Sequence, residues 1–146
     1  MERRFILGVG LVFLSLILVI FVNEFLILSV EVYPMDVYVV QDEMGFNLDE
    51  DMIHFGQVPI YSRGSYREIR ITNIYEDDVK VFLSDSGVID DFVYFQVDGN
   101  YSDQYDFILS KNETKSFKVV FENGDLSEGY YDGEIKIVVR KVFKFV

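Results

Sequence analysis

One three-residue motif in this chain matches the signature of a catalytic carboxylate. Asp85-Ser86-Gly87 has the Asp-Ser/Thr-Gly pattern of aspartic proteases, in which two carboxylates share one proton. Those sites usually have an apolar residue before the aspartate and an apolar-apolar-Gly segment later, whereas Ser84 precedes Asp85 and no such segment follows. The same sequence between two strands is typical of a turn. We therefore expect a turn at Ser84–Gly87, with an aspartic-type hydrolase using Asp85 as the alternative hypothesis.

Oxygen-bearing side chains alternate along a second stretch, as they do in calcium-binding loops. The candidate ligands are Asp98, Asn100, Asp103 and Asp106, with Ser102 between them. An EF-type loop requires a glutamate at its twelfth position, where this chain has Leu109. Asp98-Gly99-Asn100 is also a strong hairpin signal, so a solvated hairpin without metal is the preferred interpretation.

Other catalytic centres have little support in the composition. The chain holds no cysteine, which excludes disulfides, thiolate zinc sites and cysteine nucleophiles, and its one histidine excludes a site built from several. A single histidine could serve a Ser-His-Asp triad, but no Gly-x-Ser-x-Gly or Ser-x-x-Lys motif follows the N-terminal apolar run. We expect His54 to be an ordinary strand residue before the Phe55-Gly56 corner, and we predict no catalytic residue, cofactor or resident metal.

Two Asn-x-Ser/Thr sequons mark candidate glycosylation sites. They are Asn100-Tyr101-Ser102 and Asn112-Glu113-Thr114. Both lie in expected turns, where an asparagine side chain is exposed to a modifying enzyme. Asn100 and Asn112 are therefore predicted to be modified if the domain lies outside the cell in an organism with that machinery.

The elements that must position these residues are short strands. Beyond Glu31, apolar and polar residues alternate in brief runs separated by Gly, Asn, Asp and Ser. The expected strands are Met35–Val40, Met52–Phe55, Ser65–Ile74, Val79–Leu83, Val88–Val97, Asp106–Leu109, Thr114–Phe121 and Tyr131–Val139. An acidic loop is expected at Gln41–Asp51, and the mixed phase of Ser65–Ile74 suggests a bulge. About seven to nine such strands without a helical period predict an all-β, antiparallel immunoglobulin-like sandwich.

Several of these segments resemble known immunoglobulin-like domains. His54–Pro59, Arg67–Asn73 and Val79–Val81 look like the first half of domains of the abnormal-spindle/major-sperm-protein/PapD type. Phe107–Leu109, Glu113–Lys115 and Gly129–Ile135 are similar to the closing strands of secreted bacterial and archaeal modules. The resemblance implies a structural or protein-binding role, as in membrane-anchored prokaryotic, archaeal-like surface proteins. It carries over no catalytic residue.

The N-terminal run is long enough to be a membrane anchor. Phe5–Val22 holds eighteen residues with no charge and one hydroxyl. As a helix at ~1.5 Å per residue it would span about 27 Å, close to the ~30 Å core of a bilayer. A cleaved signal peptide is shorter and ends in a small-x-small site, whereas the pair Gly8-Val9-Gly10 lies near the start here. A buried core helix, apolar all round with no amphipathic period, is the third interpretation, and an uncleaved signal anchor is preferred.

The flanking charges predict an orientation. Arg3 and Arg4 precede the run, and the next basic residue after it is Arg63. By the positive-inside rule the N-terminus lies in the cytoplasm and the domain outside. The predicted division is a cytoplasmic N-terminus at 1–4, an anchor with an interfacial extension at 5–30, and an extracytoplasmic sandwich at 31–146.

The distribution of charge limits the partners. The net charge is −12, which repels phosphate backbones and argues against nucleic acid. Arg140, Lys141 and Lys144 nevertheless give the C-terminal strand a basic character. Edge protection by lysine is the preferred interpretation, and a docking edge for a partner strand or for anionic lipid headgroups is the alternative.

Together these patterns predict a single-pass, non-catalytic surface protein. Phe5–Val22 would contact membrane lipid, and the sandwich would bind an unidentified protein or stabilise a cell-surface assembly. One alternative is an accessory subunit of a surface appendage or secretion assembly, similar in layout to archaeal motility stator proteins. The other is the hydrolase that uses Asp85.

Overall fold

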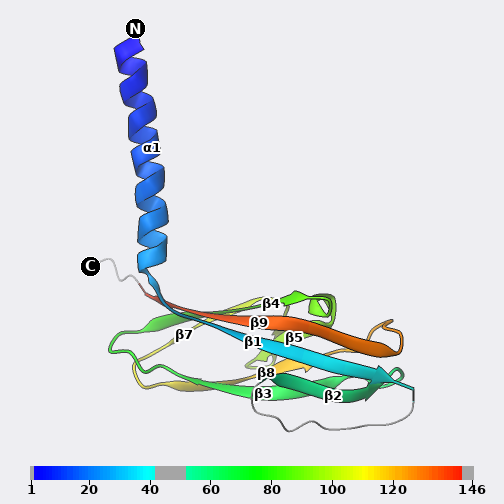
Figure 1. Cartoon of the computed structure of the whole chain (residues 1–146). Helices are drawn as coiled ribbons and strands as arrows, with labels where there is room; N and C mark the ends of the chain where they lie inside the picture. The colour runs from blue at the N-terminus through cyan, green and yellow to red at the C-terminus, as the bar shows by residue number, and fades with distance from the viewer. Residues whose placement is uncertain (1, 42–51, 143–146) are drawn as a thin grey trace.

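The computed structural model describes residues 2–41 and 52–142, with the backbone alone for residues 2–9, 23 and 24. The described part has one long helix and two packed β-sheets (Figure 1). The elements are α1 (Glu2–Phe25), β1 (Ile27–Val40), β2 (Ile53–Pro59), β3 (Ser65–Thr72), β4 (Val79–Gly87), the 3₁₀ helix η1 (Asp90–Phe92), β5 (Val93–Val97), β6 (Asn100–Ser102), β7 (Tyr105–Leu109), β8 (Thr114–Phe121) and β9 (Gly129–Lys141). Beyond α1 the chain is all-β, as predicted.

The strands form a five-stranded and a four-stranded sheet. The order in the first is β2-β1-β9-β4-β7, and in the second it is β3-β8-β5-β6. Neighbouring described strands run antiparallel, except that β1 and β2 are parallel. The predicted antiparallel sandwich is therefore correct apart from this one pair.

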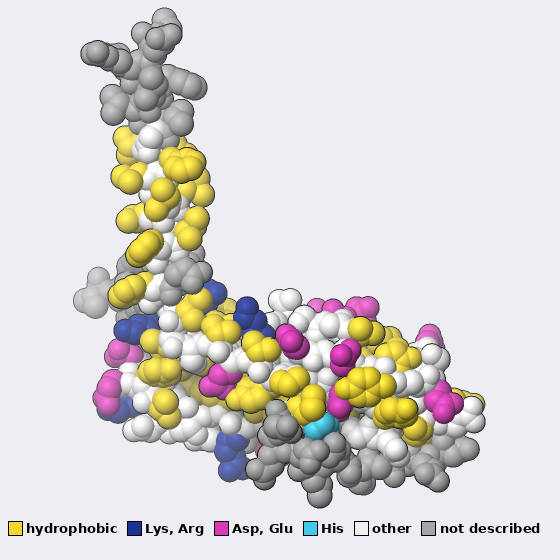
Figure 2. All heavy atoms as spheres, viewed as in Figure 1, with side chains coloured by type: hydrophobic (Ala, Val, Ile, Leu, Met, Phe, Trp, Pro, Cys, Tyr) yellow, Lys and Arg dark blue, Asp and Glu magenta, His cyan; other side chains and the backbone are white. Residues whose placement is uncertain are grey.

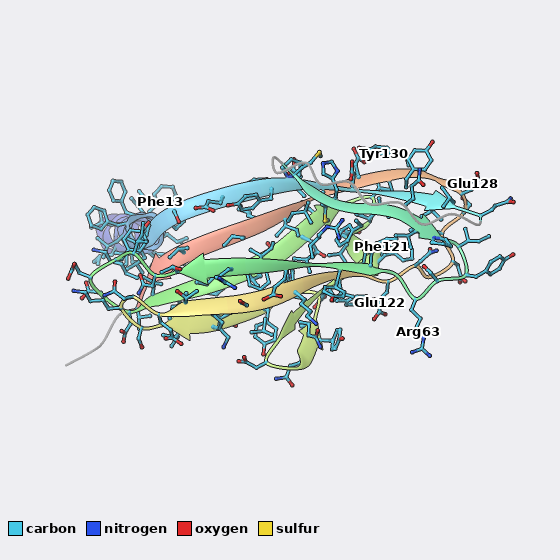
Figure 3. All side chains as sticks on the ribbon, turned by 90° about the horizontal axis from the view of Figure 1, so that it is seen from below. Phe13, Arg63, Phe121, Glu122, Glu128 and Tyr130 are labelled. Carbon is cyan, nitrogen blue, oxygen red and sulfur yellow. The ribbon has the colours of Figure 1, made fainter. Side chains whose placement is uncertain are left out.

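Period-2 alternation builds the core, because alternate side chains of a strand point to opposite faces. In β4, Val79, Val81 and Leu83 are buried while the residues between them are partly exposed. Phenylalanines from both sheets fill the centre, with the rings of Phe55 and Phe121 5.6 Å apart. Figure 3 shows Phe121 pointing into the space between the sheets. A core of this size explains how the chain folds without disulfides.

Two predictions about strands and turns differ from the structure, and one is confirmed. Ser84–Gly87 is not a turn, because β4 continues through it and pairs with β9 up to Gly87 and Gly133. The hairpin signal at Asp98–Asn100 is confirmed, because Asp98 and Gly99 form the turn and Asn100 begins β6 opposite Val97. The bulge expected in Ser65–Ile74 is also wrong, because β3 keeps one register along β8 from Ser65 to Thr72. The irregularities lie in β1 instead, between Ile27 and Ser29 and between Asp36 and Tyr38.

The sandwich begins earlier than predicted. Residues 27–30 were expected to extend the anchor, but β1 starts at Ile27 and pairs with β9 from Arg140 onward. A run of apolar residues has no period that separates helix from strand, which explains the error. Only Leu26 lies between α1 and β1, and its carbonyl accepts a 2.9 Å hydrogen bond from the Lys141 backbone N–H. The expected acidic loop falls almost wholly on residues 42–51, outside the described residues.

A buried asparagine fastens the loops at the α1 end. Asn73 is 2% exposed, and its Nδ2 lies within 3.1 Å of the carbonyl oxygens of Asp77, Leu109 and Ser110. Its Oδ1 accepts a hydrogen bond from the Tyr75 backbone N–H. A buried amide whose donors and acceptor are all used specifies one loop conformation.

Candidate functional site

Four carboxylates line a groove at the end of β4 and around η1. We call it the acidic groove; its lining residues are Asp85, Asp90, Asp91, Tyr94, Tyr101, Ser102, Asp103 and Gln104, and its volume is about 620 Å³. β4 supplies Asp85, η1 supplies Asp90 and Asp91, and the β6–β7 segment supplies Asp103. Tyr101 is 56% exposed, so the groove has an aromatic wall beside its charges.

Asp85 is the carboxylate most affected by its surroundings. Burial raises its pKa to about 6; a backbone hydrogen bond opposes the rise, and the charges of Asp90, Asp103 and Asp91 add to it. Its Oδ2 is buried and has no hydrogen-bond partner among the described residues. Asp90 and Asp103 use their Oδ1 atoms to accept the backbone N–H of the following residue. Proton sharing between two carboxylates, which an aspartic protease requires, is not seen in this groove.

The calcium candidates do not gather around one point. Asp98 Oδ2 lies 2.5 Å from Lys115 Nζ, and Asp106 Oδ2 lies 2.7 Å from Lys80 Nζ. Asp103 faces the acidic groove, and Asn100 is exposed at the start of β6. Within residues 2–41 and 52–142, no group of three or more metal-ligating side chains could hold an ion.

Both sequon asparagines lie at exposed positions. Asn100 begins the short strand β6, which pairs with the end of β5. Asn112 lies between β7 and β8 with a left-handed φ of 61°, a conformation that asparagine tolerates better than most residues. Access therefore does not prevent modification at either site, and modification itself stays a prediction.

A buried histidine–aspartate pair was not predicted from the sequence. The parallel pairing of β1 and β2 places Asp36 opposite His54, and His54 Nδ1 donates a 2.7 Å hydrogen bond to Asp36 Oδ1. Asp36 Oδ2 accepts a longer bond of 3.4 Å from the Tyr130 hydroxyl. His54 is 6% exposed, and its Nε2 has no partner among the described residues. The pair resembles the orienting half of a Ser-His-Asp triad, but no described hydroxyl meets Nε2.

Cations and apolar side chains share the outer face of the five-stranded sheet near α1. We call this the basic face; its residues are Lys80, Lys136 and Arg140, with Val30, Val32, Phe82, Ile108 and Val138. Cross-strand pairing joins them into one patch, because Lys80 lies opposite Arg140 and Phe82 lies opposite Val138. Figure 2 shows dark blue side chains gathered around the base of the helix.

The edge interpretations of the C-terminal strand are wrong. β9, which carries Arg140 and Lys141, has β1 on one side and β4 on the other, so it offers no free edge. Edge protection and docking of a partner strand on β9 are therefore both excluded. Lys144 lies outside the described residues. Contact with anionic headgroups does not require an edge.

The helix α1 has apolar side chains around its whole circumference. From Leu11 to Val22 the large apolar residues are 48–72% exposed. In Figure 1 the helix rises from one end of the sandwich and does not pack along it. Among the residues whose side chains are described, no helix is both long and apolar enough to cross a membrane.

Comparison with known proteins does not assign the chain to a family. No model of a protein family matches the chain, and no curated protein matches it. One solved structure with a similar arrangement is a Burkholderia pseudomallei antigen and type I fimbria protein. It is 11% identical with a TM-score of 0.38, and the alignment covers 76% of this chain and 96% of that one.

Proposed function

We propose that this chain is a membrane-anchored, extracytoplasmic module that binds or spaces other proteins at the cell surface and catalyses no reaction. In this proposal α1 is a single-pass anchor with its N-terminus in the cytoplasm. The sandwich belongs to the immunoglobulin-like kind that the sequence resembles.

The observation that carries the proposal is the apolar circumference of α1. Each large apolar side chain left in water forgoes roughly 1.5–3 kcal/mol of burial free energy. Eleven such side chains are exposed between Leu11 and Val22, and the sandwich covers none of them fully. The sequence extends the uncharged run back to Phe5 and places two arginines before it. A bilayer satisfies this surface, and the arginines set its direction.

Membrane extraction tests the anchor. The full chain is expected to stay in the membrane pellet after an alkaline wash and to need detergent for release. The double variant Leu14→Lys, Leu18→Lys is expected to shift to the soluble or degraded fraction, because each lysine costs about 3 kcal/mol at the centre of a spanning helix. The matched variant Leu14→Ile, Leu18→Ile is expected to stay membrane-bound. Release of the unmodified chain by the alkaline wash would refute the anchor.

Cysteine labelling tests the orientation. The chain has no cysteine, so one introduced by Tyr61→Cys is the only thiol, and Tyr61 is 89% exposed. A maleimide that cannot cross membranes is expected to label this variant in intact cells. Labelling only after the cells are broken open would place the sandwich on the cytoplasmic side.

We place the protein-binding site at the acidic groove. It combines concavity, four carboxylates and the exposed ring of Tyr101, and tyrosine is enriched at protein interfaces. This arrangement suits a basic segment of a partner. A photo-crosslinking residue at position 101 is expected to join one discrete partner, and the Asp90→Asn, Asp91→Asn double variant is expected to lose it. The same crosslinker at Tyr66, which is 55% exposed on β3 at the opposite edge of the four-stranded sheet from β6, serves as the control. Equal crosslinking from both positions would refute a site at the groove.

A second candidate, an accessory subunit of a surface appendage or secretion assembly, has its own observation. β7 is an edge strand of five residues without proline or lysine, and its Ile108 is 54% exposed. By contrast β3, an edge of the other sheet, carries Arg67 and Arg70. An unprotected edge is suited to accept a strand from a neighbouring subunit. Ile108→Lys is expected to weaken such an assembly while leaving membrane anchoring unchanged.

A further inference from the structure

The basic face and α1 lie on the same side of the molecule. α1 rises on the side of the five-stranded sheet, whereas β3 and β8 lie on the opposite side (Figures 1 and 3). The hydrogen bond from Lys141 N–H to Leu26 fixes the end of β9 at the base of the helix. Arg140 therefore lies next to Lys141, whose backbone N–H contacts the junction at Leu26.

We propose that the basic face rests on an anionic lipid surface, so that the sandwich lies along the membrane. This rests on the proposed function, because α1 must span the bilayer for the face to meet its surface. A bilayer crossed by α1 would lie on the helix side of the sandwich, where the outer face of the five-stranded sheet is turned.

The cations of this face are only partly neutralised. Lys80 pairs with Asp106 at 2.7 Å, but no described carboxylate forms an ion pair with Lys136 or Arg140. The Arg140 guanidinium lies 5.2 Å from the centre of the Phe82 ring, and Lys80 Nζ lies 4.8 Å from it. Phe82 thus holds two cations at the surface of a chain whose net charge is −12. Cations without an ion-pair partner on the sheet surface are free to attract lipid phosphates.

Apolar side chains between the cations suit the headgroup boundary. Val30, Val32 and Ile108 are 47%, 49% and 54% exposed. Val30 lies opposite Val138 and Val32 lies opposite Lys136, so the apolar and basic residues alternate across the strands. Surfaces that bind the membrane interface combine buried apolar area with attraction of cations to anionic lipids.

The face changes sign away from the helix. Beyond Lys136 the outward residues of β9 are Glu134 and Asp132, and Asp132 lies opposite Asp36 of β1. Carboxylates are repelled by an anionic surface. The contact therefore covers the part of the sheet next to α1 and ends near Glu134.

A spin label on the face tests the proposal in the full chain. Ser84 lies opposite Lys136, and Ser84→Cys supplies the only thiol for a nitroxide. The chain is inserted into vesicles of phosphatidylcholine, with and without phosphatidylglycerol. Collisions of the label with a water-soluble nickel chelate are expected to fall several-fold when phosphatidylglycerol is present and to recover in high salt. A label at Ser116→Cys, exposed on the other sheet, is expected to show no change.

Charge removal supplies an independent arm. Lys136→Gln with Arg140→Gln is expected to weaken the contact by about 25-fold, at about fivefold for each charge. Lys115→Gln with Lys118→Gln removes the same charge from β8 on the other sheet and is expected to leave the label at residue 84 protected.

The outcomes separate the anchor from the surface contact. A chain that floats with neither kind of vesicle refutes the anchor and this proposal together. A chain that floats with both but shows equal collision rates at residue 84 refutes the proposal alone. Protection that is independent of lipid charge and rises with the ratio of protein to lipid would assign the face to a second copy instead.

Discussion

The two ends of the five-stranded sheet carry opposite charges. Next to α1, Lys80, Lys136 and Arg140 lie among apolar side chains on the outer face. At the far end, Asp85 enters a groove with three other carboxylates, and Asp36 and Asp132 lie opposite each other. Strand pairing is continuous from one end to the other, so the difference lies in the side chains and not in the backbone.

This difference agrees with the two roles proposed above, a lipid contact next to α1 and a protein-binding groove at the far end. The end near α1 has the charges that suit an anionic surface. Buried polar atoms without a partner among the described residues occur at both ends, including Asp85 Oδ2 and His54 Nε2 at the far end and Arg140 Nε next to α1. Unsatisfied groups lower stability, and they concentrate at sites that bind or react. Four experiments test how far the two ends differ.

The largest effect is expected at the far end, where Gly87 of β4 lies opposite Gly133 of β9. Gly87 has a φ of +118°, and a Cβ there would lie 2.5 Å from Gly133 Cα. Gly87→Ala therefore combines backbone strain with a backbone clash and is expected to lower the free energy of unfolding by about 3 kcal/mol. Gly99→Ala is the control, because Gly99 has a φ of +84° but no atom within 4 Å of the added Cβ. Equal urea midpoints for the two variants would contradict the clash.

A buried pair and an exposed pair compare the two ends directly. Asp36→Ala leaves His54 Nδ1 buried without its acceptor and is expected to cost about 2 kcal/mol of unfolding free energy. Asp106→Ala removes an exposed ion pair, in which the Asp106 side chain is 53% exposed and the Lys80 side chain 37%. Its loss is expected to lower the free energy of unfolding by less than about 1 kcal/mol. Urea denaturation of both variants measures the difference, and a reversed order would show that the far end is not the more constrained.

The pKa of Asp85 predicts a dependence of stability on pH. Its folded pKa of about 6 exceeds the ordinary 3.8, so the fold favours the protonated form and loses stability as the pH rises through this interval. Because the side chain is partly exposed, solvent screening reduces the loss to about 1 kcal/mol. Asp85→Asn is expected to be more stable than the parent by that amount above about pH 7 and equal to it below 3.8.

The smallest effect concerns calcium. Asp98 and Asp106 are each paired with a lysine, and no three metal-ligating side chains among the described residues are placed to hold an ion. Added calcium and added chelator are expected to give the same thermal midpoint. A midpoint that rises with calcium concentration would restore the metal hypothesis for these residues.

Most of the sandwich could be predicted from local patterns. The alternation in Val79–Leu83 and Thr114–Phe121 predicted β4 and β8, and the start of β4 and both bounds of β8 were correct. Period 2 with clear turn residues is a local signal, and local signals are read from sequence. The start of β1 could not be predicted in this way, because its first residues continue an apolar run that began in the helix.

Contacts between distant segments could not be predicted. Asp36 meets His54 only because β1 and β2 pair in parallel, and no hairpin turn announces such a pair. The position of β9 between β1 and β4 likewise depends on the order of strands in the sheet, which neither strand encodes alone. The same holds for the acidic groove, where Asp85 and Asp103 were singled out for two unrelated sites and the carboxylates of η1 were not singled out at all.

The single residue between α1 and β1 also limits how far the helix and the sandwich could tilt independently of each other. Leu26 is held by Lys141, so the helix and the sheet share a junction without a flexible linker. A tilt of α1 would therefore tilt the sandwich with it, about this junction. The far end of the sheet, with its acidic groove, would be displaced most because it lies farthest from the junction. A small tilt of the helix would thus raise or lower the groove relative to its surroundings. The longer the strands, the larger this displacement would be.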